Sequence, residues 1–281
     1  MRRTLTVVGL LLAVSGSLLA HDLFLKLTDY FVAPETTVKV TVLNGTFSTS
    51  ENYITRDRLV DVSLVAGGTR GAVDTTAWTP TANGKSGFVS VRVGAPGTYV
   101  LGASTRPREL KLPGKEFNAY LKDEGLGDML AQRERLGELE LPSNERYHKH
   151  VKAIFQVGDR RTNDFSAVLG YPAEIVPDRN PYDLKVGDEL SVHCLLAETN
   201  ANTGSLLQEV AATNVVVLAG GRTPAGARIP LQTVRSGTDG VARIKLTAPG
   251  LWYVKFISME KTTRDGLTVE SKWATMTFAI R

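Results

Sequence analysis

The sequence predicts an all-β protein of two tandem immunoglobulin-like β-sandwich domains, the first with a short helical insertion. Short segments of alternating apolar residues recur along the chain, separated by Gly, Pro and Asp-Gly turns, and this pattern is typical of β-sandwiches. One block of such segments occurs twice, and a single stretch has helical spacing instead. We expect a signal peptide over residues 1–20 and domains over residues 21–160 and 170–281.

The N-terminal segment has the pattern of a secretory signal peptide. Arg2 and Arg3 precede an apolar core over residues 7–14, and small residues lead to Ala20, which is the order of a charged region, a hydrophobic region and a cleavage site. The uncharged run ending at Ala20 is shorter than the about 20 apolar residues that span a membrane. We expect an exported protein, periplasmic or secreted, that is cleaved near Ala20 and has no transmembrane segment in its mature chain.

Two distant blocks of the chain resemble each other in order and spacing. Both alternate, then read Ala-Pro-Gly, then place an aromatic residue two positions later, which is Tyr99 in one block and Trp252 in the other. We infer an internal structural repeat. The matching segments are 87–101 with 240–254, 62–68 with 215–221, and 34–42 with 186–194.

One stretch of the first block has apolar residues at helical spacing. It lies near residues 115–137 and includes Phe117 and Leu121. No proline interrupts it, but Gly125 and Gly127 divide it, and glycine weakens a helix interior. The sequence therefore predicts two short helices joined at Glu-Gly-Leu-Gly.

Composition and motifs exclude several functional classes. The chain has 33 Lys and Arg against 29 Asp and Glu; without the two signal-peptide arginines the balance is 31 against 29, and the positive residues are too scattered for a nucleic-acid interface. The single cysteine, Cys194, excludes an internal disulfide and is predicted to be a small buried hydrophobe. No phosphate-binding loop, G-x-S-x-G or H-E-x-x-H motif occurs, so no catalytic or cofactor-binding residue is assigned.

Two histidines lie in the alternating segment His-Lys-His-Val-Lys. A spacing of two places His148 and His150 on one face of a strand together with Lys152, while Phe155 faces the other way. Two imidazoles on one face suit a transition metal, whereas Lys149 and Lys152 would repel a cation. The alternative is a solvated face of an edge strand.

Cleavage after Ala20 would make His21 the first residue of the mature chain. Its imidazole and its α-amine, whose pKa is about 8, would then chelate one ion together, and Asp22, His148 or His150 would complete the coordination. Nitrogen donors suit nickel, copper or zinc. The alternative is a histidine that merely begins the first strand.

Five separated blocks, in order, resemble the bacterial exported family known as domain of unknown function 4198, which is associated with nickel uptake. The resemblance implies a periplasmic or surface-exposed protein of two β-sandwich units that binds nickel or another metal for a transporter. Members start with a histidine followed shortly by an aromatic residue, matched here by His21 and Phe24. Many carry a His-Met pair where this chain has Ser258 and Met259. The blocks are AHDLFLKL, PGKEFNAYLKDEGL, ERYHKHVKAIFQVG, LGYPAEIVPDRNPYDLKVGDELSV and ESKWATMTF.

Three functional classes follow from these patterns. The first is a non-enzymatic, exported metal-binding protein that supports nickel or other transition-metal uptake beside a transporter component, with His21, Asp22, His148 and His150 as ligands. The second is a structural or adhesive module that presents loops to a protein, cell-surface or carbohydrate partner. The third is an oxidative copper enzyme with a first-position histidine brace. Such an enzyme needs a flat aromatic surface for its substrate, and this sequence shows none. We expect the first class, and hence no enzyme.

Overall fold

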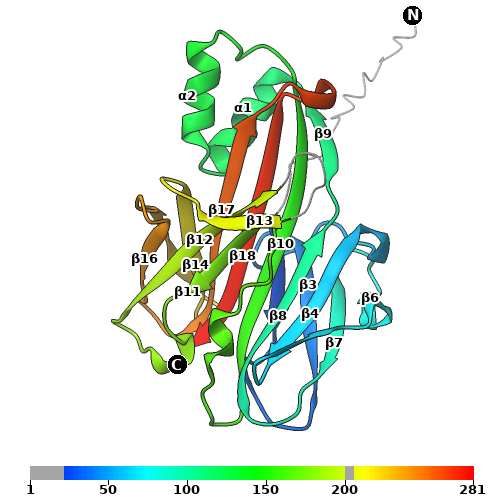
Figure 1. Cartoon of the computed structure of the whole chain (residues 1–281), viewed down its shortest axis with the longest axis vertical. Helices are drawn as coiled ribbons and strands as arrows, with labels where there is room; N and C mark the ends of the chain where they lie inside the picture. Colours follow the sequence, from blue (N-terminus) through cyan, green and yellow to red (C-terminus); the bar gives the residue numbers. More distant parts are fainter. Residues whose placement is uncertain (1–21, 200–205) are drawn as a thin grey trace, which may run out of the picture.

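The computed structural model describes residues 22–199 and 206–281 and shows an all-β protein with two short α-helices (Figure 1). The predicted signal peptide and His21 lie outside the described residues. No helix in the described part of the chain is long and apolar enough to cross a membrane. The strands form three sheets, two outer ones and a long central one.

The first outer sheet belongs to the N-terminal half. Its strands follow the order β1-β3-β7-β6, and every neighbouring pair is antiparallel. Alternate residues of β3, among them Val38, Val40 and Val42, are buried as the periodicity predicts. The bounds are β1 (Asp22–Leu27), β3 (Thr37–Gly45), β6 (Trp78–Pro80) and β7 (Gly87–Arg92).

The central sheet runs through both halves of the molecule. Its order is β15-β14-β17-β18-β10-β8-β4-β5, and β2 and β9 pair with opposite ends of β10. β10 is parallel to β18 and β2, and the other pairs of this sheet are antiparallel. The bounds are β2 (Phe31–Val32), β4 (Leu59–Ala66), β5 (Thr69–Ala72), β8 (Gly97–Thr105), β9 (Arg108–Leu112), β10 (Ser143–Val157), β14 (Val216–Arg222), β15 (Arg228–Arg235), β17 (Gly250–Lys261) and β18 (Val269–Ile280).

The second outer sheet belongs to the C-terminal half. β12 pairs with β11, β13 and β16, all antiparallel. Cys194 of β12 is fully buried, and burial raises the pKa of its thiol to about 12, so the side chain is the small hydrophobe that the sequence predicts. The bounds are β11 (Ala173–Pro177), β12 (Glu189–Thr199), β13 (Leu206–Ala211) and β16 (Val241–Lys245).

The two outer sheets lie on opposite faces of the central sheet. Thr275 of β18 donates a hydrogen bond to the carbonyl of Leu23 in β1 at 2.7 Å. The next residue, Met276, is the register partner of Lys152, whose ammonium forms an ion pair with Glu174 of β11. Because successive side chains of a strand point to opposite faces, the first outer sheet covers one face, here called the β1 face, and β11 covers the other, here called the β11 face.

Strand order repeats between the halves, which confirms the internal repeat. The order β5-β4-β8-β10 corresponds to β15-β14-β17-β18, and β1-β3-β7 corresponds to β11-β12-β16. Each copy also ties its aromatic residue back to a carbonyl four positions earlier. The Tyr99 hydroxyl donates to Ala95 at 2.8 Å, and the Trp252 indole N–H donates to Ala248 at 3.0 Å.

The two halves share one continuous sheet. Residues Glu145–Ala153 of β10 pair in register with Val269–Thr277 of β18, and one apolar core cluster contains residues of both halves. The β content and the repeat therefore agree with the sequence-based prediction, whereas this topology does not by itself establish two tandem immunoglobulin-like domains.

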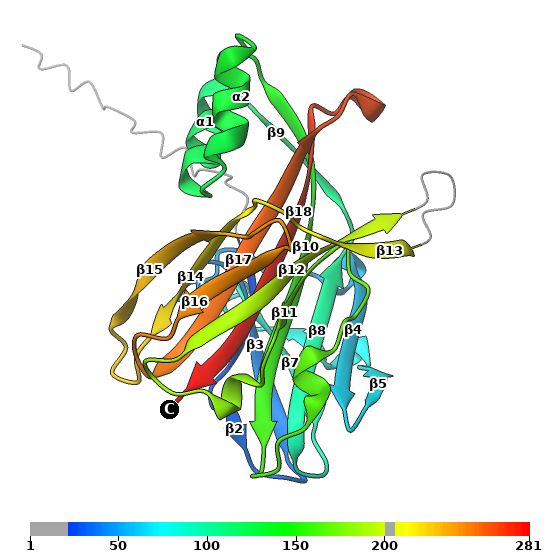
Figure 2. The same cartoon turned by 60° about the vertical axis from the view of Figure 1, so that its left-hand side comes forward.

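The helical insertion lies between β9 and β10, at the end of the molecule opposite the C-terminus (Figure 2). It consists of α1 (Gly114–Asp123) and α2 (Gly127–Arg135), as predicted. Gly125 lies between the helices at φ +75°, a left-handed conformation that glycine adopts without strain. Phe117 and Tyr120 of α1 are buried, and the Tyr120 ring stacks on Trp273 at 6.1 Å between centroids.

Candidate metal centre

Strand β10 carries polar side chains on both of its faces. It has paired neighbours along both edges, and His150 is only 2% exposed while His148 is half-buried. The solvated face of an edge strand, the alternative that the sequence allowed, is therefore wrong. The prediction that His148, His150 and Lys152 share a face holds, and that face is the β11 face.

The two imidazoles are direct neighbours. Their ring centroids lie 4.8 Å apart in an edge-to-face arrangement, with 80° between the planes. Nδ1 of His150 makes a 2.9 Å hydrogen bond with the hydroxyl of Ser104. Nε2 of His150 is buried and has no hydrogen-bond partner, although such an atom normally costs free energy when unpaired. In the tautomer in which Nδ1 is protonated and donates to Ser104, this nitrogen has a free lone pair for an external donor or an ion.

Both rings are held in the neutral form. Burial, and to a lesser degree the nearby ammonium of Lys272, lowers the pKa of His148 to about 4. Burial also lowers the pKa of His150 well below its usual value, with His148 and Lys272 as lesser causes. Neutral imidazole is the form that ligates metals, so a metal would not have to displace a proton from either ring at neutral pH.

Two of the three lysines near the histidines do not oppose a bound cation. Lys149 points to the β1 face, away from the histidines, because its register partner is Trp273 and not Ala274. Lys152 is buried in an ion pair with Glu174 and also donates to the Ala167 carbonyl at 2.8 Å, so its charge is compensated. Lys272, the register partner of His148, remains as the opposing charge.

Asp22 lies on the opposite face from the histidines. Its Oδ2 atom is 2.5 Å from the ammonium of Lys255, which also binds Glu124 at 2.8 Å. Lys255 is the register partner of Thr275 and so faces β1. Burial lowers the pKa of Lys255, but the two carboxylates outweigh burial and raise it overall. Within residues 22–199 and 206–281, no group of three or more His, Cys, Asp or Glu lies close enough to hold a metal ion.

A second buried polar cluster surrounds this ion pair on the β1 face. Glu145 is fully buried and accepts hydrogen bonds from the hydroxyls of Tyr120, at 3.1 Å, and Ser271; burial raises its pKa to about 7. Lys149 donates to the Asn44 side chain at 2.7 Å, and burial lowers its pKa to about 8. We did not expect these residues from the sequence. The available signal was the run of consecutive polar residues that begins at Ser143 and Asn144. A strand with one face in the core would alternate polar and apolar residues instead.

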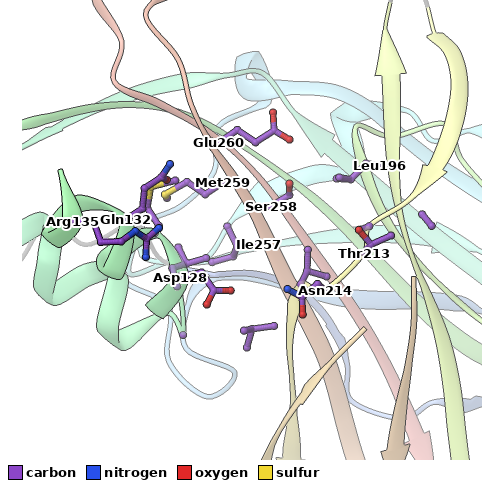
Figure 3. A pocket seen from close by; sticks show the side chains of 17 residues that line it. Asp128, Gln132, Arg135, Leu196, Thr213, Asn214, Ile257, Ser258, Met259 and Glu260 are labelled. Atoms are coloured by element: carbon purple, nitrogen blue, oxygen red, sulfur yellow. The ribbon is translucent and has the colours of Figure 1, made fainter. Parts of the chain in front are cut away.

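A cavity of about 470 Å³ separates α2 from the C-terminal half. Figure 3 shows Asp128, Gln132 and Arg135 on the helix side, and Thr213 and Asn214 across from them. Ser258 and Met259 of β17 lie between the two sides, at the position of the His-Met pair that many family members carry. Neither a histidine nor a cysteine lines this cavity, so it offers a metal only one thioether from that pair.

We expect the His148→Gln variant to resist acid better than the wild type. The folded pKa of His148 is lowered to about 4, so between pH 6.5 and 4 the unfolded chain takes up a proton that the folded chain does not, and stability falls as pH falls. Between pH 7.0 and 4.5 the variant should lose about 2.5 kcal/mol less stability than the wild type. Urea unfolding at pH 7.0 and 4.5 measures this, with the exposed His193→Gln as control; equal acid losses in wild type and His148→Gln would contradict the expectation.

Comparison with known proteins finds one matching family profile. The sequence profile described as "Domain of unknown function (DUF4198)" matches residues 18–260. No curated protein matches the chain. Three solved structures resemble this chain only weakly, with TM-scores of 0.22 to 0.23. They are dimeric latent PorU from Porphyromonas gingivalis (10% identity, TM-score 0.22, 92% of this chain and 20% of that one), a tetra-tandem repeat from the extending region of a large adhesion protein (12%, 0.22, 93% and 50%), and trypsin-activated alpha-2-macroglobulin from Escherichia coli (9%, 0.23, 92% and 15%). The chain thus spans half or less of each of them.

Proposed function

The chain belongs to the DUF4198 family, whose profile matches residues 18–260, and from this premise we propose an exported, non-enzymatic protein that binds a transition metal ion. The ion is nickel, copper or zinc, and the protein supports its uptake beside a transporter component. The described ligands are the imidazoles of His148 and His150, and His21 at the start of the mature chain stays in the proposal as a further ligand. Asp22 does not join the histidine pair because it belongs to β1 and binds Lys255 on the opposite face of the central sheet.

One observation carries the proposal. Nε2 of His150 is a buried, unpartnered nitrogen beside a second neutral imidazole. The hydrogen bond between Nδ1 and Ser104 leaves Nε2 available and orients the ring, which is how outer partners hold metal-ligating histidines. Two nitrogen donors suit the later first-row divalent metals, with copper expected tightest in a simple affinity series.

Burial supports binding instead of catalysis. A catalytic metal needs an open coordination position beside a substrate, whereas His150 is only 2% exposed. We also propose that each half is an immunoglobulin-like sandwich. In both halves a sheet of the repeated order faces an outer sheet, β1-β3-β7 in one and β11-β12-β16 in the other.

Calorimetric titration of the processed protein, beginning at His21, with nickel, copper and zinc salts tests the metal-binding function. We expect one site, and at least about tenfold weaker binding, or 1.4 kcal/mol, in each of the variants His148→Gln and His150→Gln. His193→Gln is the matched control because this histidine is exposed on β12, away from the pair. Its affinity should equal that of the wild type.

Two further outcomes separate the alternatives. A protein with one alanine added before His21 loses the N-terminal chelate. If this protein binds the metal more weakly while His148→Gln and His150→Gln bind it as the wild type does, the metal site lies at the N-terminus. No binding of any of the three metals would overturn the proposed function and favour the structural or adhesive module.

A further inference from the structure

A second cavity, of about 570 Å³, lies between the two halves on the side away from the histidines. One wall is the segment Thr46–Thr49 that follows β3, and the other is formed by the ends of β14 and β15, with Tyr253 of β17 between them. The volume falls within the about 300–1,000 Å³ of small-molecule sites. Nothing in the proposed metal-binding function uses this cavity, here called the arginine cleft.

Positive charge gathers in the arginine cleft without a counter-charge. Arg222 and Arg228 both line it and are register partners on β14 and β15, and like charges directly opposite on a ladder repel each other. Lys26 adjoins them and donates to the Phe47 carbonyl at 3.3 Å. Its pKa is lowered by burial and then by Arg222. No Asp or Glu lines the cleft, and within the described chain none of the three cations pairs with a carboxylate.

Neutral groups hold the key guanidinium in place. Nε of Arg222 donates to the Ser48 hydroxyl at 3.0 Å, and Nη1 donates to the Gly226 carbonyl at 3.0 Å. Both contacts position the side chain without neutralising it. Guanidinium and ammonium groups gathered in this way bind carboxylate or phosphate oxygens through charge-assisted hydrogen bonds.

The remaining wall of the cleft is apolar. Tyr253 presents a half-buried ring that packs on Phe47, with 4.9 Å between ring centroids. Leu231 also lines the cleft and is 58% exposed. A ligand with a charged end and a compact apolar or ring-shaped body would cover both regions.

We propose that the arginine cleft binds a small organic anion, with its carboxylate or phosphate between Arg222, Arg228 and Lys26 and its body against Tyr253 and Leu231. The anion relieves the repulsion between the cross-strand arginines, and the body removes apolar surface from water. The ligand class is thus defined by one oxyanion and one apolar face.

Calorimetry or NMR titration of the processed protein with four probes tests the proposal: phenyl phosphate, benzoate, inorganic phosphate and phenol. Phenyl phosphate or benzoate should bind at least about tenfold tighter than inorganic phosphate and phenol, because only they offer both parts. The stronger of the two probes identifies the oxyanion. Affinity should fall as salt rises, since the site is partly solvated. Equal binding of phenol, or no binding of either aromatic anion, would overturn the proposal.

Variants locate the site. Arg222→Gln and Arg228→Gln should each weaken the better aromatic anion at least about tenfold, while Arg92→Gln, an exposed arginine on β7 paired with Glu35, should not. Without ligand, Arg228→Gln should raise the thermal midpoint because it removes the cross-strand repulsion, and this readout also shows that the variant is folded. Unchanged affinity in both cleft variants, or a lower midpoint for Arg228→Gln, would contradict the proposal.

Discussion

The Lys152→Met variant should lose about 3–5 kcal/mol of unfolding free energy, which is the usual effect of removing one partner of a buried ion pair. Lys152 and Glu174 are both almost fully buried, and the pair joins the central sheet to β11. The carboxylate of Glu174 also accepts the backbone N–H groups of Leu169, at 3.0 Å, and Tyr171, at 2.6 Å. Without Lys152 this charge stays buried with hydrogen bonds but no counter-ion. Urea unfolding followed by tryptophan fluorescence measures the loss.

Two controls separate charge from packing. The double variant Lys152→Met with Glu174→Gln removes both charges and keeps an amide oxygen for the backbone donors, so it should recover much of the lost stability. Arg92→Met breaks an exposed pair with Glu35 at 3.4 Å, and exposed pairs contribute about 0–1 kcal/mol. A loss below about 1 kcal/mol in Lys152→Met would show that this pair does not hold the layers together.

The Trp252→Ala variant should lose a comparable amount, about 3–5 kcal/mol, since it deletes a large aromatic side chain from a close-packed core. Trp252 is fully buried in the C-terminal repeat, and its indole N–H donates to Ala248 at 3.0 Å. Trp252→Phe keeps most of the volume and should lose clearly less. Thermal and urea unfolding of the two variants give both numbers.

Tyr99→Phe is the matched control in the other repeat. It deletes only the hydroxyl that donates to Ala95 and accepts from Gly94, so it should cost about 0.5–1.5 kcal/mol per hydrogen bond. If Trp252→Ala lost no more unfolding free energy than Tyr99→Phe, the stability of the C-terminal core would not depend on the Trp252 side chain.

In strand β10 the local sequence pattern predicts which residues share a face, but it does not predict whether that face is buried. The alternation in the sequence predicted which residues share a face, and His148, His150 and Lys152 do share one. The same pattern could not tell that both faces are covered, because burial of the second face comes from β11, which follows β10 in the chain and folds back over it. The sequence therefore left a solvated face open as the alternative to a ligand pair, whereas this face holds two neutral imidazoles in the folded protein.

The candidate sites divide in the same way. Spacing alone brought His148 and His150 together, since residues two apart on a strand are neighbours on one face. Asp22, Lys255 and Glu124 come from β1, β17 and the end of α1, and no local pattern relates segments so distant. Arg222 and Arg228 are close in sequence, but they become a charged cleft only where Thr46–Thr49 of the other half faces them.

By itself the sequence determined the β class, the two inserted helices and the buried state of Cys194, because each of these depends on periodicity or composition within a few residues. It also determined the internal repeat, because the two copies keep the same order and spacing of residues. Only the tertiary structure decided that β10 and β18 join the halves into one sheet, that Asp22 and the histidines lie on opposite faces, and that Arg222 and Arg228 line one cleft beside Lys26. These features depend on contacts between segments more than a hundred positions apart. Every strand offers the same backbone N–H and C=O groups to a neighbour, so the choice of partner is made by the packing of the whole core.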